Sequence, residues 1–145
     1  MVMERTTCSC NECVDCCKRQ PAALVAGDME RIAAFLGKSL EDAKAYFWAS
    51  PGAVAMNRAT GRVWRIGTIT PRWDRRRKRC VFLTDEDRCS IHEVAPFGCA
   101  YFDTHMDHDE GHTRALMALD SQQTDEYQEL RRSLPLADHY KPRRV

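Results

Sequence analysis

The stretch Cys10-Asn11-Glu12-Cys13-Val14-Asp15-Cys16-Cys17 decides the fold, because it places four thiols within eight residues in the spacing C-x2-C-x2-C-C. A short segment with this spacing can direct several sulfurs to one point, where a soft metal cation is needed to hold the thiolates together. Buried thiols that pack only as small hydrophobic groups do not need this spacing. The stretch therefore predicts a metal site.

Four more cysteines bear on this site: Cys8 lies just upstream of the stretch, and Cys80, Cys89 and Cys99 lie far downstream. A site that joins residue 10 to Cys99 closes a long loop, so the free energy of metal binding also becomes free energy of folding. We therefore expect the metal to be part of the core.

Length and composition set the general class. The chain has 145 residues, of which 43% are hydrophobic and 30% charged, and a formal net charge of +1. These values predict a single soluble globular domain over 1–145, with no general attraction to nucleic acid or membranes. Residues 1–7 lack the pattern of a secretory signal, and no run of about 20 apolar residues follows. We expect a cytoplasmic protein, in which eight cysteines serve as thiolate ligands more readily than as disulfides.

The first predicted helix covers residues 29–36. Asp28 can cap its start and Gly37 ends it. The helical spacing is expected to bring three apolar side chains onto the core face: Ile32, Phe35 and Leu36.

A second helix is predicted behind Ser39, which opens a loose capping box, and it should run to residue 48. Alternating polar and apolar residues predict a strand at 62–66, and 68–71 should continue extended. Residues 80–83 and 89–92 read as the arms of a β-hairpin that would bring Cys80 and Cys89 toward each other.

The run 72–79 holds six cationic side chains beside Trp73. Such a run is typical of a single-stranded nucleic-acid surface, or of a solvated hairpin tip whose charge offsets an anionic thiolate site. The rest of the chain has no second basic face, which disfavours nucleic acid as a partner. The acids at 85–87 are expected to be solvated turn residues rather than a site for a hard cation.

Several motifs in order resemble one known family: the C-x2-C-x2-C-C stretch, Gly27-Asp28 opening a helix, 80–83, 89–92, and Pro96-x2-Cys99. Over residues 8–103 the chain resembles the CxxCxxCC cysteine-cluster family of zinc- or iron-chelating domains. The resemblance leaves Cys8 outside the motif. It implies that seven residues are metal ligands: Cys10, Cys13, Cys16, Cys17, Cys80, Cys89 and Cys99.

The chain departs from the family pattern at Ala95 and Ala100, where the family usually has arginines. The resemblance also implies a link to flagellin lysine N-methylases, which carry a similar cluster. Neither a glycine-rich nucleotide-binding turn nor a C-x3-C-x2-C run is present to support a methyltransferase.

The identity of the metal stays open at this point. The C-x2-C-x2-C run resembles the start of a ferredoxin motif, in which a distant cysteine supplies the fourth ligand to an iron-sulfur cluster. One such cluster would leave three of the seven cysteines unused. Two zinc ions with bridging thiolates would use six or seven sulfurs and would suit the adjacent pair Cys16-Cys17.

The C-terminal part, 104–145, is predicted to be a His-rich loop followed by a helix. Three histidines form a second candidate metal site together with nearby Asp107 and Asp109: His105, His108 and His112. Gly111 and the lack of apolar periodicity favour a solvated loop instead.

Residues 113–119 are apolar enough for a strand or helix packed on the core. Thr124 should then cap a final helix that runs through Arg132, with Tyr127, Leu130 and Leu134 facing inward.

Together these patterns predict a small α+β domain in which short helices and a β-hairpin are organised around a cysteine-rich metal site. Its function is expected to be metal binding in a structural, redox or sensing role, with a metal ion as partner and room for a protein partner. A metal- or iron-sulfur-dependent enzyme or enzyme component is the alternative, and an RNA-binding or adaptor module using Arg72 to Arg79 is the second.

Overall fold

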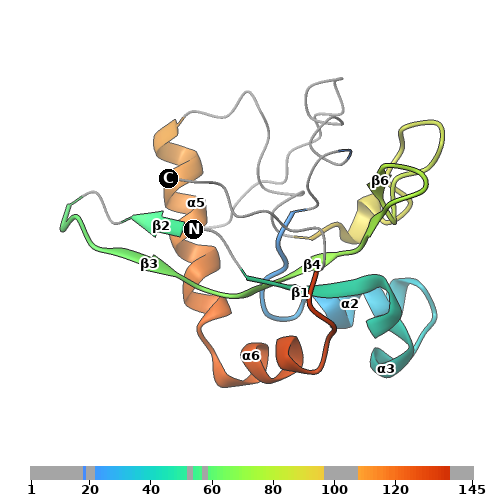
Figure 1. Cartoon of the computed structure of the whole chain (residues 1–145), viewed down its shortest axis with the longest axis horizontal. Helices are drawn as coiled ribbons and strands as arrows, with labels where there is room; N and C mark the ends of the chain where they lie inside the picture. Colours follow the sequence, from blue (N-terminus) through green and yellow to red (C-terminus); the bar gives the residue numbers. More distant parts are fainter. Residues whose placement is uncertain (1–17, 19–21, 52–53, 57–58, 97–107, 138–145) are drawn as a thin grey trace.

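The computed structural model describes residues 18, 22–51, 54–56, 59–96 and 108–137. Helices precede and follow an uninterrupted series of short antiparallel strands in this part of the chain, which confirms the predicted α+β class (Figure 1). In chain order the elements are α2 (Asp28–Phe35), α3 (Leu40–Ala43), the 3-10 turn η1 (Lys44–Tyr46), β1 (Phe47–Ser50), β2 (Val54–Met56), β3 (Val63–Arg65), β4 (Thr68–Pro71), β5 (Trp73–Asp74), β6 (Arg79–Cys80), the 3-10 turn η2 (His92–Val94), α5 (His108–Gln122) and α6 (Asp125–Arg132).

The antiparallel pair β1–β4 forms the centre of the fold, with Ala49 opposite Ile69. On the outer edge of β1, Ala49 N donates to Pro135 O (2.9 Å) and Ala49 O accepts from Ala137 N (3.0 Å). On the outer edge of β4, Leu24 N donates to Ile69 O over 2.8 Å. Chain segments on both sides therefore satisfy backbone groups that an exposed edge would leave open to other chains.

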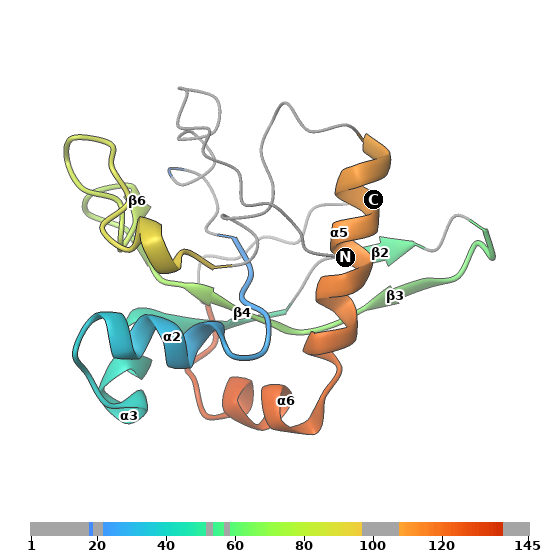
Figure 2. The ribbon, with the colours of Figure 1, turned by 180° about the vertical axis from the view of Figure 1, so that it is seen from behind.

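Two further antiparallel pairs extend from this centre. The pair β2–β3 projects on one side, and the pair β5–β6 lies on the other, in the view of Figure 1 and again from behind in Figure 2. In the β5–β6 turn, Asp74 Oδ1 accepts hydrogen bonds from the backbone N–H groups of Arg76 (2.9 Å) and Arg77 (3.2 Å). This side-chain cap stabilises the turn that precedes Cys80.

The hydrophobic core joins α2 to the strands and to the segment between Cys80 and Cys89. Phe82 comes from that segment, and its ring lies 5.8 Å from the ring of Phe47 and 5.6 Å from that of Tyr46, centroid to centroid. The fully buried side chains of Ile32 and Ile91 belong to the same cluster. Packing of these side chains therefore holds the cysteine-bearing segment against the body of the protein.

Local signals located α2 to within one residue, but its start and its core face differ from the prediction. Asp28 is the first residue of the helix rather than its cap, and no side chain caps this start. Gly37 takes a left-handed conformation (φ 67°) after the helix, as a helix-ending glycine should. Ile32 is buried and Leu36 half-buried, whereas Phe35 is 45% exposed. The prediction that Phe35 faces the core was wrong, because the neighbouring elements cover a narrower stripe of the helix than its apolar residues span.

The second predicted helix starts correctly and ends early. Ser39 caps it through its hydroxyl, which accepts from Asp42 N over 3.1 Å. The helix stops at Ala43, and Phe47 and Trp48 lie in β1 rather than in a helix. Phe47 is fully buried opposite Pro71, so pairing with β4 and core burial outweigh a short helical pattern.

At the C-terminal end, α6 confirms the predicted helix: the Thr124 hydroxyl accepts from Tyr127 N (3.3 Å), and Tyr127 and Leu134 are buried. The loop expected around Gly111 is instead the first part of α5. The stretches that the structure describes contain no helix both long and apolar enough to cross a membrane.

Candidate metal-binding site

Two of the seven predicted ligands lie among the described residues. Cys80 is buried at the end of β6, and Cys89 is half-buried just before η2. The other five, and Cys8, lie outside the described residues: Cys10, Cys13, Cys16, Cys17 and Cys99. The convergence of the early and late cysteines therefore stays a prediction.

The path from Cys80 to Cys89 is a compact double turn. Leu83 N donates to Cys80 O over 3.0 Å, and Leu83 then forms an isolated antiparallel bridge with Cys89. A four-residue turn and one bridged pair limit the separation of the two cysteine Cα atoms to about 12 Å. The predicted hairpin of 80–83 with 89–92 is thus reduced to one bridge, but it still brings the two cysteines to one side of the fold.

The surroundings of Cys89 disfavour an isolated thiolate but would suit a metal-bound one. Burial raises the pKa of the Cys89 thiol, because it disfavours an isolated charge. The backbone N–H of Ile91 hydrogen-bonds to the sulfur and offsets only part of this rise in the pKa. A metal cation would remove that penalty, since it neutralises the sulfur while the N–H bond stays in place.

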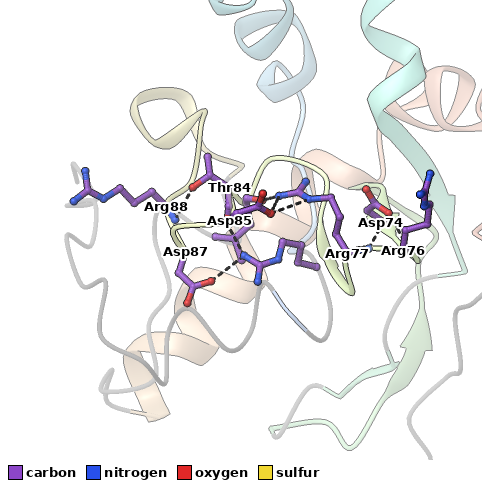
Figure 3. Close-up of polar contacts among 9 residues, drawn as sticks. Asp74, Arg76, Arg77, Thr84, Asp85, Asp87 and Arg88 are labelled. Carbon is purple, nitrogen blue, oxygen red and sulfur yellow. Dashed lines mark hydrogen bonds and ion pairs between the residues drawn. The ribbon is translucent and has the colours of Figure 1, made fainter.

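An acidic loop, residues 84–88, separates the two cysteines, and arginines from the β5–β6 hairpin hold it (Figure 3). Arg77 donates to Leu83 O (2.6 Å) and to Asp85 Oδ1 (3.1 Å). Arg79 donates to Thr84 O and to Asp87 Oδ1, the latter over 2.8 Å. The hairpin and the acidic loop therefore form one charge-paired unit around the segment that carries the cysteines.

These contacts account for much of the basic run. Besides Arg77 and Arg79, Arg72 donates through Nε to Phe47 O (3.2 Å), and its guanidinium lies 5.8 Å from the Trp48 ring. At least three of the six cations thus bind groups of the chain itself. Trp73 is only half-exposed and its indole N–H is already bonded, which leaves less of the stacking platform that a single-stranded nucleic acid needs.

Nothing in the sequence indicates the contacts that Lys18 makes. Its backbone O accepts from Trp73 Nε1 (3.0 Å), and its Nζ lies 3.0 Å from Asp87 Oδ2. Trp73 is the cross-strand partner of Cys80. The residue that directly follows Cys17 in the chain therefore lies against the segment between Cys80 and Cys89. The contacting residues are 55 and 69 positions apart in the chain. No periodic sequence pattern extends over such separations, so the sequence could not predict these contacts.

The second candidate metal site lies partly in a helix rather than in the predicted loop. His108 and His112 belong to α5, four positions apart, so the prediction of a loop there was wrong. His105 and Asp107 lie outside the described residues. Within the described ranges no three His, Cys, Asp or Glu residues are grouped closely enough to hold a metal ion.

Comparison with known proteins gives one match. A family model described as "CxxCxxCC: Putative zinc- or iron-chelating domain" matches residues 9–129. The match begins after Cys8 and continues through α5 into α6, well beyond residue 103, where the motifs themselves end. No curated protein and no solved structure matches the chain.

Proposed function

The chain belongs to the CxxCxxCC family of zinc- or iron-chelating domains, and from this premise we propose that it binds zinc or iron through clustered cysteine thiolates. The ligands are drawn from the early motif and from the later cysteines, with Cys8 excluded: Cys10, Cys13, Cys16, Cys17, Cys80, Cys89 and Cys99. Binding would tie the two ends of a segment of about ninety residues to one centre.

The observation that carries this proposal is the position of Lys18. Two hydrogen bonds hold it against Trp73 of β5, which pairs with Cys80, and against the acidic loop, which lies between Cys80 and Cys89. Consecutive Cα atoms are about 3.8 Å apart, so Cys17 cannot be far from the residue that follows it. This contact supports a shared centre for the early and late cysteines.

The surroundings of Cys80 and Cys89 also fit a bound zinc ion or iron-sulfur cluster. Cys80 is buried, and Cys89 already accepts the backbone N–H of Ile91. Such sulfur ligands favour zinc or an iron-sulfur cluster over magnesium or calcium, which prefer oxygen ligands. A bound zinc would supply folding energy, whereas an iron-sulfur cluster would supply a one-electron redox centre.

The first experiment is anaerobic purification of the full chain, followed by elemental analysis and a visible spectrum. We expect stoichiometric metal. A colourless protein with zinc supports a structural or sensing role, and a brown protein with iron supports a redox role or that of an enzyme component. A chelator should lower the melting temperature as it removes the metal. A metal-free, equally stable protein would contradict the proposal.

Ligand assignment is tested with single serine variants. Cys89→Ser and Cys80→Ser should each lower the bound metal, whereas Cys8→Ser, outside the family match, should retain it. The Cys8 variant is the matched control, because it loses a thiol that is not a proposed metal ligand. Equal metal content in all three variants would remove Cys80 and Cys89 from the ligand set.

A further inference from the structure

We propose that Asp87 is a positioning residue for the thiolate site, because its carboxylate joins Lys18 of the early motif region to Arg79 beside Cys80. This inference rests on the proposed metal-binding function and adds a residue that binds no metal itself. Its role is to hold the two ligand-bearing regions together before the metal arrives.

Each carboxylate oxygen of Asp87 contacts a different cation. Oδ2 lies 3.0 Å from Lys18 Nζ, and Oδ1 lies 2.8 Å from Arg79 Nη1. With both oxygens paired to cations, Asp87 is better suited to joining two side chains than to ligating an ion. The side chains of Lys18, Asp87 and Arg79 are 34%, 43% and 16% exposed, so the Arg79 contact is the most sheltered from water.

The loop backbone fixes the direction of this carboxylate. Asp87 has a left-handed conformation (φ 61°), which aspartate and asparagine tolerate better than most residues. Its N–H donates to Thr84 O over 3.0 Å, and Thr84 N donates to Arg88 O over 2.8 Å. The acidic loop thus presents Asp87 in one defined orientation toward Lys18 and Arg79.

All three members of this clamp lie within two positions of a proposed ligand in the chain. Lys18 follows Cys17, Arg79 precedes Cys80, and Asp87 lies two positions before Cys89. Holding these points together reduces the entropy that metal binding has to offset, which is how preorganisation raises affinity. Trp73 provides a second tie to Lys18, so loss of Asp87 should weaken the metal site without abolishing it.

The test compares the metal affinity of variants of the full chain by competition with a chromophoric chelator, using the metal found in the purified protein. Asp87→Asn keeps the backbone conformation and removes the charge. We expect about fivefold weaker binding, the scale of one partly exposed ion pair. Asp85→Asn is the matched control, because Asp85 lies in the same loop but forms its ion pair with Arg77.

Two variants of Lys18 distinguish a positioning role of Asp87 from an effect on the stability of the acidic loop, because neither variant changes a residue of that loop. Lys18→Gln should reproduce the loss, and Lys18→Arg, which can keep the ion pair, should retain the affinity. In the Lys18→Gln, Asp87→Asn double variant, affinity should fall little further than in either single variant.

The outcomes are distinguishable. Equal effects of Asp87→Asn and Asp85→Asn, or additive effects of the Lys18 and Asp87 changes, would overturn the positioning role while leaving metal binding intact. Absence of metal from the unaltered protein would overturn the proposed function, and this role with it.

Discussion

Replacing Tyr127 by phenylalanine tests how the chain that leaves the cysteine motif is fixed to the core. The buried hydroxyl of Tyr127 donates to Leu24 O (2.7 Å) and accepts from Ile69 N (2.8 Å). One hydroxyl thus joins α6 both to the segment leading into α2 and to the edge of β4. Phenylalanine keeps the ring and its packing, so the change removes these two bonds together with the hydroxyl's contact to the Gln122 side chain.

The expected cost follows from what each partner loses. Leu24 O still accepts from Gln122 Nε2 over 3.0 Å, whereas the N–H of Ile69 is left without the tyrosine oxygen in a buried position. A buried backbone donor without an acceptor costs about 1–3 kcal/mol, so the free energy of unfolding should fall by about 2 kcal/mol. For a chain of this size the melting temperature should drop by roughly 6 °C.

The pH dependence should change as well. Burial raises the pKa of Tyr127 far above that of a free tyrosine, which is about 10. Above pH 10 the unfolded chain releases this proton first, so the folded state loses up to about 1.4 kcal/mol per pH unit from this group. The contribution is fully present below pH 10 and is lost as the pH rises. Tyr127→Phe should show a shallower alkaline decline than the unaltered protein.

Urea denaturation followed by circular dichroism, at pH 7 and between pH 9.5 and 11, measures both effects. Tyr46→Phe is the control, because the Tyr46 ring is half-buried against Phe82 and should lose less than 1 kcal/mol. A Tyr127→Phe variant as stable as the control, or one with an unchanged alkaline slope, would refute the role given to this hydroxyl.

Two further substitutions test other contacts by the same urea denaturation assay. Gly67→Ala should destabilise the protein by about 1–3 kcal/mol, because a Cβ there meets the guanidinium of Arg131, which donates twice to Ser50 O. In an Arg131→Ala background the same glycine change should cost much less. Arg77→Gln should cost about 1 kcal/mol through lost contacts to the acidic loop, whereas the neighbouring exposed Arg76→Gln should be near neutral, and equal losses would contradict the pairing described.

Helix boundaries set by caps could be predicted from the sequence. Ser39 and Thr124 each supply a hydroxyl that accepts a backbone N–H of the first turn, and Gly37 takes the left-handed conformation that ends α2. These signals act over three or four residues, so the local sequence contains all of the physics involved.

Elements that depend on distant partners were predicted less well. Phe47 leaves its expected helix because it is buried opposite Pro71, and Phe35 stays largely exposed although its helix face is apolar. Residues around Gly111 form part of α5, since one glycine costs a helix only about 1 kcal/mol, which the other interactions of a fifteen-residue helix can offset.

By itself, the sequence determined the α+β class, the family and the set of cysteines to test, because cysteine spacing and short motifs lie along the chain. Only the tertiary structure brought Lys18 to Trp73 and Asp87, and paired several arginines of the basic run with the chain's own carbonyls and carboxylates. Those contacts join residues 55 and 69 positions apart, and the packing of the whole core decides such neighbours.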